Sequence, residues 1–190
     1  MAARAPATVS YDAYREAERV SDRKHEYRDG AIVAMSGGTI EHGRLGAKLL
    51  ALLGAALEGR RCTVLSSDVR IRVAATNRAF YPDGSVVCGT IDRATDDTDA
   101  ITNPIVVIEV LSDSTEGYDR GEKARHYRGL TSLREYVLVS QSEQLVEVWE
   151  PAGRSWRTRE HYAGEVVVLS SIDVSFAVDD LYRDPLRGDG

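Results

Sequence analysis

The sequence FYPDGSVV (80–87), followed by NPIVVIEVLSDST (103–115) and DRGEKARHY (119–127), decides the fold. The first two runs predict strands, and the second is so rich in β-branched apolar residues that we expect it to be buried on both faces. The third run predicts a helix that begins at Asp119 and ends just before Gly129. Two strands and a helix in this order predict a sheet with a helix packed against it.

Two acidic residues occupy unusual places in these predicted strands. Asp83 follows a proline directly, and Glu109 lies inside the apolar run. A carboxylate in a buried strand is costly unless it is paired or binds a metal. If the two strands are neighbours, both carboxylates can hold one Mg²⁺ or Mn²⁺ ion, because these ions prefer oxygen ligands and keep several waters. Lys123, in the following helix, is the cation that we expect to face them and to stabilise charge developing on a phosphate.

Each of these residues also has a purely structural explanation. Asp83 taken alone is better explained as the turn residue of Pro-Asp-Gly. Lys123 can pair with Asp119 on the same helix face, and Tyr127 fits a packing role better than a catalytic one. Glu109 is harder to explain in this way, because an apolar strand offers nothing to solvate it. The combination therefore favours a site.

The segments on the N-terminal side predict a helix, a hairpin and a longer helix. A short helix that runs to Val20 can be capped by Thr8 or Ser10. The Asp-Gly pair at 29–30 is a favoured two-residue hairpin turn. Residues 40–58 carry leucines at helical spacing and predict the longest helix of the chain.

The remaining segments complete a mixed sheet. The acidic, turn-rich segment 91–100 is expected to be a surface loop. From Glu135 onward, short β-rich runs separated by turns predict an antiparallel meander. We therefore expect one α/β or α+β domain over residues 1–190, with a core from about 8 to 183 and a loose tail at 184–190.

The composition is that of a globular protein. With 43% hydrophobic and 28% charged residues the chain can bury a full core, and no apolar run is long enough to span a bilayer. The start, MAARAPATVS, lacks the apolar stretch of a secretory signal. Cys62 and Cys88 are too few for a disulfide framework, which favours a reducing cytoplasm. The net charge of −6 argues against nonspecific coating of nucleic acid, but not against a nuclease whose own carboxylates hold a metal.

The ordered motifs resemble a known family. YPDGSVV, IVVIEVLSDST, DRGEKARHY and LREYVLV, preceded by HEYRDGAIVAMSGGTIEHGRL, are similar to the Uma-two family of restriction endonuclease-like proteins, a branch of the PD-(D/E)XK nuclease superfamily. The resemblance runs from about Tyr11 to Tyr182. It implies a restriction-endonuclease-like core, with a mixed central sheet flanked by helices. It also implies a metal-dependent endonuclease that hydrolyses phosphodiester bonds in DNA.

The resemblance assigns roles to individual residues as well. Asp83 and Glu109 would hold Mg²⁺ or Mn²⁺ together with the main-chain carbonyl of Val110. The superfamily pattern places a lysine two residues after the second acid, where this chain has Leu111. The following helix would supply the missing cation through Lys123.

Further candidates each have two explanations. Tyr127 would help to position Lys123 or would contact phosphate. The resemblance suggests that Glu26 and Asp68 reach the site, but Glu26 can equally be a surface charge of the hairpin and Asp68 a turn residue. His42, at the start of the long helix, can meet phosphate or a water, although local capping or packing is the better explanation.

Two functions of different classes are compatible with the sequence. The first is the Mg²⁺-dependent endonuclease. The alternative is a catalytically inactive, nuclease-like homodimer that binds nucleic acid or a protein, which the acidic balance and the missing strand lysine favour. A dimer is expected in either case by analogy, because cutting both strands of DNA takes two active sites. Binding of a divalent ion distinguishes the two functions.

Overall fold

The structure is a computed structural model, and it describes residues 8–186. Within this range the helical segments are α1 (Tyr11–Arg19), α2 (Ile40–Ala56), the 3₁₀ turn η1 (Ala74–Thr76), α3 (Glu116–Tyr118), the π-helical turn η2 (Asp119–Lys123), α4 (Ala124–Tyr127) and α5 (Val178–Tyr182). The strands are β1 (His25–Arg28), β2 (Ala31–Ala34), β3 (Cys62–Ser66), β4 (Arg70–Val73), β5 (Arg78–Phe80), β6 (Gly84–Cys88), β7 (Arg93–Ala94), β8 (Asp97–Ile101), β9 (Val106–Val110), β10 (Glu135–Val139), β11 (Leu145–Ala152), β12 (Ser155–Tyr162), β13 (Val166–Leu169) and β14 (Val174–Ala177).

Two mixed sheets and a hairpin make up the β-structure of the described residues. One six-stranded sheet runs β12-β11-β10-β9-β6-β3, with β9 and β10 parallel and their outer neighbours antiparallel. The sheet nearer the N-terminus runs β2-β1-β5-β4-β8-β7, and β13 pairs with β14. The predicted mixed sheet flanked by helices and the predicted antiparallel C-terminal strands are therefore confirmed.

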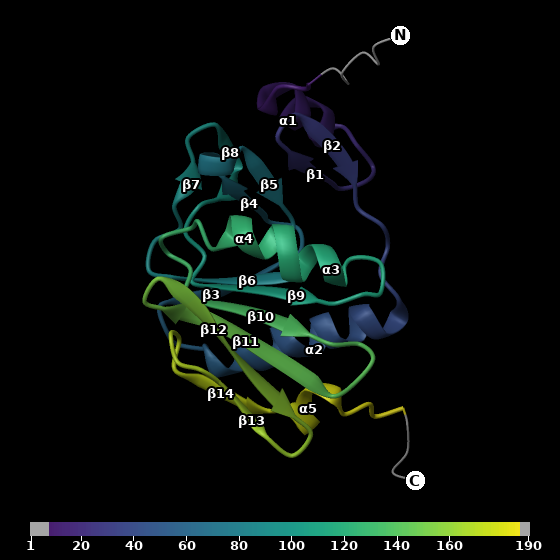
Figure 1. The fold of residues 1–190 in the computed structure, drawn as a ribbon, viewed down its shortest axis with the longest axis vertical. Coiled ribbons are helices and arrows are strands. Elements are labelled where there is room, and N and C mark those ends of the chain that lie inside the picture. Colours follow the sequence, from purple (N-terminus) through teal and green to yellow (C-terminus); the bar gives the residue numbers. More distant parts are fainter. Residues whose placement is uncertain (1–7, 187–190) are drawn as a thin grey trace.

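Alternation along β9 sends its side chains to two different cores. Ile108 and its even-numbered neighbours pack with Leu49 of α2 and with the β13–β14 hairpin. Val107 and Leu111 face the opposite way and pack with Tyr127 of α4 and with residues of β4 and β5. The helical segment 116–127 therefore lies between the two sheets, while α2 covers the far face of the β9–β10 sheet (Figure 1).

The N-terminal predictions are confirmed in detail. Ser10, rather than Thr8, caps α1 by accepting a hydrogen bond from the backbone of Ala13. The predicted hairpin forms around Asp29 and Gly30, and both residues adopt positive φ, as this turn requires. No helix of the described range combines the length and apolarity that crossing a bilayer requires.

The acidic segment 91–100 is not the surface loop that its composition predicts. It forms β7 and β8, and the side chain of Asp97 is almost fully buried. Arg70 binds this carboxylate with two hydrogen bonds and Tyr11 with a third, so the charge is compensated inside the fold. The partners lie far away in the sequence, which explains why local composition is misleading here.

The helix predicted from Asp119 begins three residues earlier and changes its winding. Glu116 to Tyr118 form an α-helical turn, and Asp119 to Lys123 then form a π-helical turn. The widened turn accommodates one extra residue, and such turns are frequent at functional sites. Of the tail expected at 184–190, residues 187–190 lie outside the described residues, as do residues 1–7.

The two cysteines form a disulfide, which removes the argument from the cysteines for a reducing cytoplasm. Cys62 and Cys88 stand directly opposite each other in the β3–β6 ladder and are bonded through their sulfurs. The cross-strand register that joins them is not visible in the sequence. The bond ties β3 to β6, the strand that follows Asp83.

Reduction of this disulfide is expected to lower the free energy of unfolding by about 3 kcal/mol, because it frees a loop with a sequence separation of 26 in the unfolded chain. Urea unfolding with and without a thiol reductant measures the difference. The Cys62→Ser/Cys88→Ser variant should unfold identically under both conditions. If the free energy of unfolding of the wild type is the same with and without the reductant, the disulfide does not contribute to stability.

Candidate active site

Sheet register brings Asp83 and Glu109 together. Gly84 pairs with Ile108 in the antiparallel β6–β9 ladder, and one further step in this register places Asp83 opposite Glu109. Opposite residues project from the same face of a sheet. That face is the one covered by the helical segment 116–127, so the Glu109 carboxylate meets Lys123, and Asp83 lies near enough for its charge to act on Glu109.

Local contacts hold the Asp83 carboxylate in place. Its Oδ2 accepts a hydrogen bond of 2.7 Å from the backbone N–H of Val110 and lies 3.3 Å from Nε2 of His42. Gly84 leaves room beside it for α2, since a Cβ there would lie 2.5 Å from Cδ2 of Leu50, which would have to move. The Pro-Asp-Gly sequence is therefore a turn and a site element at once.

Lys123 lies at the centre of a group of acids. Its Nζ is 2.7 Å from Oε1 of Glu109, 3.2 Å from Oε1 of Glu26 and 3.6 Å from Oδ1 of Asp119. The lysine and its three partners each have side chains only 5% exposed. Tyr127 adds a hydrogen bond of 3.2 Å from its hydroxyl to Oε1 of Glu109.

Burial and mutual repulsion shift the pKa values of these groups. Burial raises the pKa of Glu109 well above its usual value, with further increases from the charges of Asp119 and Asp83 and a decrease from Lys123. Burial also raises the pKa of Asp119. Although burial alone lowers it, the pKa of Lys123 lies above its usual value, because Glu109, Glu26 and Asp119 surround the ammonium. The surrounding acids therefore favour the charged form of the lysine.

A cleft of about 1210 Å³ opens onto these groups. It is lined by carboxylates from Glu26, Asp83, Glu109 and Asp119, by the cations of Arg23, Lys24, Arg28 and Lys123, and by the glycine-rich segment before α2. Most of the cations are already paired: Arg28 binds Glu26, and Lys24 binds the exposed Asp68. The cleft thus combines an acidic floor with a rim that carries the positive charge of Arg23.

The structure brings most of the predicted site residues together. Glu26 is not a surface charge, because β1 buries it against Lys123. His42 does not cap α2, since the hydroxyl of Thr39 does so, and its ring reaches Asp83 instead. The hydrogen bond with Asp83 raises the pKa of His42.

Two predicted residues lie differently. Asp68 does not reach the cleft: it is an exposed turn residue bound to Lys24. Tyr127 is fully buried, so its hydroxyl serves Glu109 and is not available to a phosphate. The backbone of Val110 does lie at the site, between Asp83 and His42.

Asp119 is the acid that the sequence argument missed as a site residue. It was expected only as a helix partner of Lys123, yet it lines the cleft and is buried. The spacing Asp-x-x-x-Lys was the available signal. The spacing does not show that Asp119 and Lys123 belong to a π-helical turn, or that Lys123 also contacts two buried glutamates.

The donor set fits a hard divalent cation. Asp83 and Glu109 offer two carboxylates on one face, and Glu26 and Asp119 lie beside them, paired with Lys123 and Arg28. Within residues 8–186 no group of three or more His, Cys, Asp or Glu side chains is arranged as a complete metal cage. Mg²⁺ is typically bound by one or two carboxylates while waters and substrate phosphates fill its other positions.

Comparison with known proteins identifies the family of the chain and supports its fold. A protein of Synechocystis is 38% identical over 176 residues, covering 92% of each chain, and a second one is 33% identical over 144 residues, covering 75% of this chain and 81% of the relative; both are named as uncharacterized. A crystal structure described as a putative nuclease from Anabaena variabilis superposes with a TM-score of 0.71 at 18% identity, covering 85% of this chain and 91% of that one, and supports the fold. The family model described as "Putative restriction endonuclease" matches residues 11–179. The chain belongs to this family, Uma2.

Proposed function

We propose that the protein is a Mg²⁺-dependent endonuclease that hydrolyses phosphodiester bonds in DNA. The observation that carries the proposal is the meeting of Asp83 and Glu109 on one sheet face, with the Lys123 ammonium 2.7 Å from the second acid, at the floor of a cleft. Two carboxylates and a cation in this arrangement suit phosphoryl chemistry, in which charge builds on the transferred group.

The chain's own groups have distinct tasks in this mechanism. Asp83, Glu109 and the carbonyl of Val110 would hold the ion, Mg²⁺ or Mn²⁺. When bound, the ion acidifies the attacking water and neutralises charge on the phosphate. Lys123 fixes Glu109 through its short contact and stabilises negative charge as it develops in the cleft. Tyr127 donates to Oε1 of Glu109 and so orients that carboxylate.

The rim of the cleft would bind the DNA backbone. Arg23 and Lys24 lie there, and α2 begins beside them after Gly37 and Gly38. A Cβ at Gly38 would lie 2.8 Å from Nδ1 of His42, so this glycine allows the imidazole to reach Asp83. Backbone N–H groups at the start of a helix and cations at the rim both favour a phosphate chain.

Assembly and location follow from the same proposal. A homodimer would present two clefts, one for each strand of a duplex, and sedimentation at several protein concentrations measures whether it forms. The cytoplasm is the compartment in which such an enzyme meets DNA.

A cleavage assay tests the proposed function. We expect the purified protein to nick or linearise supercoiled DNA with Mg²⁺ or Mn²⁺ and to leave it intact with a chelator. Parallel reactions with linear and single-stranded DNA and with RNA define the substrate. Equal cleavage with and without divalent ions would contradict the metal assignment. Divalent binding without cleavage of any nucleic acid would favour the inactive binding module.

A further inference from the structure

Glu18 joins the two chain segments that carry the site acids. Its side chain projects from α1 and is 5% exposed. Oε1 accepts hydrogen bonds from the backbone N–H of His25, at 2.9 Å, and from the hydroxyl of Tyr81, at 3.1 Å. Oε2 lies 2.9 Å from Nδ1 of His25. The Glu18 carboxylate therefore binds both His25, which directly precedes Glu26, and Tyr81, which lies two residues before the other site acid, Asp83.

Helix α1 fixes the backbone of His25 from both sides. Glu18 accepts from the N–H of His25, and the hydroxyl of Tyr14 donates to its carbonyl oxygen at 2.6 Å. The next residue in β1 is Glu26, whose Oε1 lies 3.2 Å from Nζ of Lys123. A displacement of His25 along β1 would thus move a carboxylate that contacts the central lysine.

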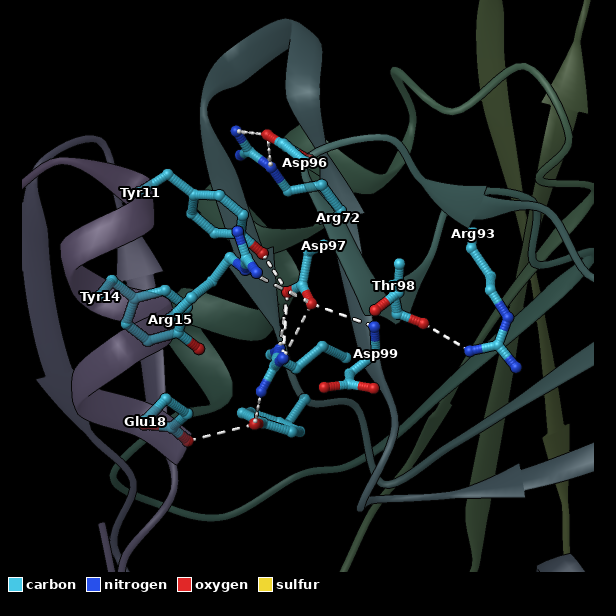
Figure 2. A network of polar contacts seen from close by, with 12 residues as sticks. Tyr11, Tyr14, Arg15, Glu18, Arg72, Arg93, Asp96, Asp97, Thr98 and Asp99 are labelled. Carbon is cyan, nitrogen blue, oxygen red and sulfur yellow. Dashed lines mark hydrogen bonds and ion pairs between the residues drawn. The ribbon is translucent and has the colours of Figure 1, made fainter. Parts of the chain in front are cut away.

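The hydroxyl of Tyr81, the other partner of Glu18, is also held by two hydrogen bonds. It accepts a hydrogen bond of 2.7 Å from Nη1 of Arg70 while donating to Glu18. The opposite edge of Arg70 forms two hydrogen bonds with Asp97, which also accepts from Tyr11. Figure 2 shows Tyr11 and Glu18 of α1 reaching the two ends of this network, whose buried acid is Asp97.

We propose that Glu18 is a positioning residue of the site, which holds Glu26 and Asp83 at a fixed separation although the two acids belong to different sheets. The inference rests on the proposed function, because it assigns Glu18 to the geometry of the divalent-ion site. Glu18 touches neither Lys123 nor the site carboxylates; it acts through the backbone of His25 and the hydroxyl of Tyr81.

Residues that orient metal ligands typically change metal affinity by 10- to 100-fold when they are replaced. Glu18→Gln keeps the shape of the side chain but removes its charge. Its amide oxygen can still accept from the N–H of His25 and the hydroxyl of Tyr81, but these hydrogen bonds lose the charge assistance that roughly doubles their strength, and the amide nitrogen replaces the acceptor that faces Nδ1 of His25. Tyr81→Phe keeps the ring and removes only the hydroxyl that joins Arg70 to Glu18. Both variants should therefore weaken the hydrogen bond between Glu18 and Tyr81, each by changing one of its two partners.

Calorimetric titration of the full chain with Mn²⁺ tests the inference. We expect Glu18→Gln and Tyr81→Phe each to raise the Mn²⁺ Kd by about tenfold or more, at a temperature where circular dichroism shows both variants folded. The double variant should be no weaker than the weaker single variant, because both changes break one link. The matched control is Glu16→Gln on the same helix, whose exposed carboxylate binds Arg19; its Kd should equal that of the wild type.

The outcomes separate this inference from the function on which it rests. Wild-type Mn²⁺ affinity in folded Glu18→Gln and Tyr81→Phe would overturn the positioning role while leaving the endonuclease proposal intact. A wild-type protein that binds no Mn²⁺ would overturn the metal-dependent function and the role of Glu18 with it. If Glu18→Gln does not fold, the comparison of Tyr81→Phe with the wild type decides.

Discussion

Replacing Asp83 with asparagine is expected to lower divalent-dependent DNA cleavage by at least about 10²-fold, since an ion that it helps to hold supplies several kcal/mol of charge stabilisation. Asparagine has the same shape and keeps an oxygen that can accept from the backbone N–H of Val110. It lacks the negative charge that a divalent ion requires. The fold should survive, because the β6–β9 ladder does not depend on this charge.

The control for this experiment is Asp68→Asn. Asp68 was another candidate from the sequence, but it lies on the surface and binds Lys24. Its replacement should leave the chemical step unchanged. Initial rates of plasmid nicking and the Mn²⁺ Kd are measured for both variants and for Glu109→Gln. Full cleavage by Asp83→Asn and by Glu109→Gln would remove the active-site assignment.

The pair of acids could be predicted because their signal is local. Glu109 stands in a run of apolar residues, where a charge must have a partner, and Asp83 stands in a turn that begins the neighbouring strand. Lys123 could be predicted because the chain places its helix directly after β9. In each case the strand or helix identity alone defines the direction of the side chain.

Residues whose role depends on distant partners could not be predicted in this way. For Glu26 the resemblance suggested the site, but the sequence left a hairpin surface charge equally open, and only the placement of β1 against the π-helical turn that carries Lys123 decides between them. Asp97 looks like part of a solvated loop until Arg70 is placed beside it. The disulfide partner of Cys62 depends on the register of β3 against β6. Sheet order and register are properties of the whole fold, and no short segment of sequence encodes them.

The buried charges of the site contribute little to the stability of the fold. Glu109 and Lys123 are buried together, and a buried ion pair usually contributes little net stability after desolvation. An apolar pair of similar volume would pack in the same space. Stability alone therefore does not explain why Glu26, Asp83, Glu109 and Asp119 lie beside one cleft, whereas the proposed divalent-ion site does.

Replacing Lys123 with methionine is expected to lower the free energy of unfolding by about 3–5 kcal/mol, the usual cost of leaving buried charge without its partner. Methionine fills a similar volume, so the effect reports charge rather than a cavity. Glu109, Glu26 and Asp119 would then face one another without the ammonium. The comparison is Lys24→Met, which breaks an exposed pair with Asp68 and should cost less than about 1 kcal/mol.

The pH dependence of the Lys123→Met variant follows from the direction of the Glu109 pKa. Burial already raises this pKa in the wild type, and Lys123 is the group that lowers it. Without the lysine the folded protein holds a proton on Glu109 more tightly than the unfolded chain does, so the stability of the variant is greatest at low pH. It should fall as the pH rises from about 4.3, the ordinary pKa of a glutamate, through the raised pKa of the folded state.

Urea unfolding of the wild type and the variant in a chelator, at a series of pH values from acid to neutral, measures this difference. The loss of stability on removing Lys123 should grow with pH. Cleavage should fall, because no ammonium stabilises the developing charge. Mn²⁺ binding to the variant should strengthen as the pH rises, because Glu109 must lose its proton before it can hold the ion. A variant with wild-type stability at every pH would show that Lys123 does not oppose the negative charge of the site carboxylates.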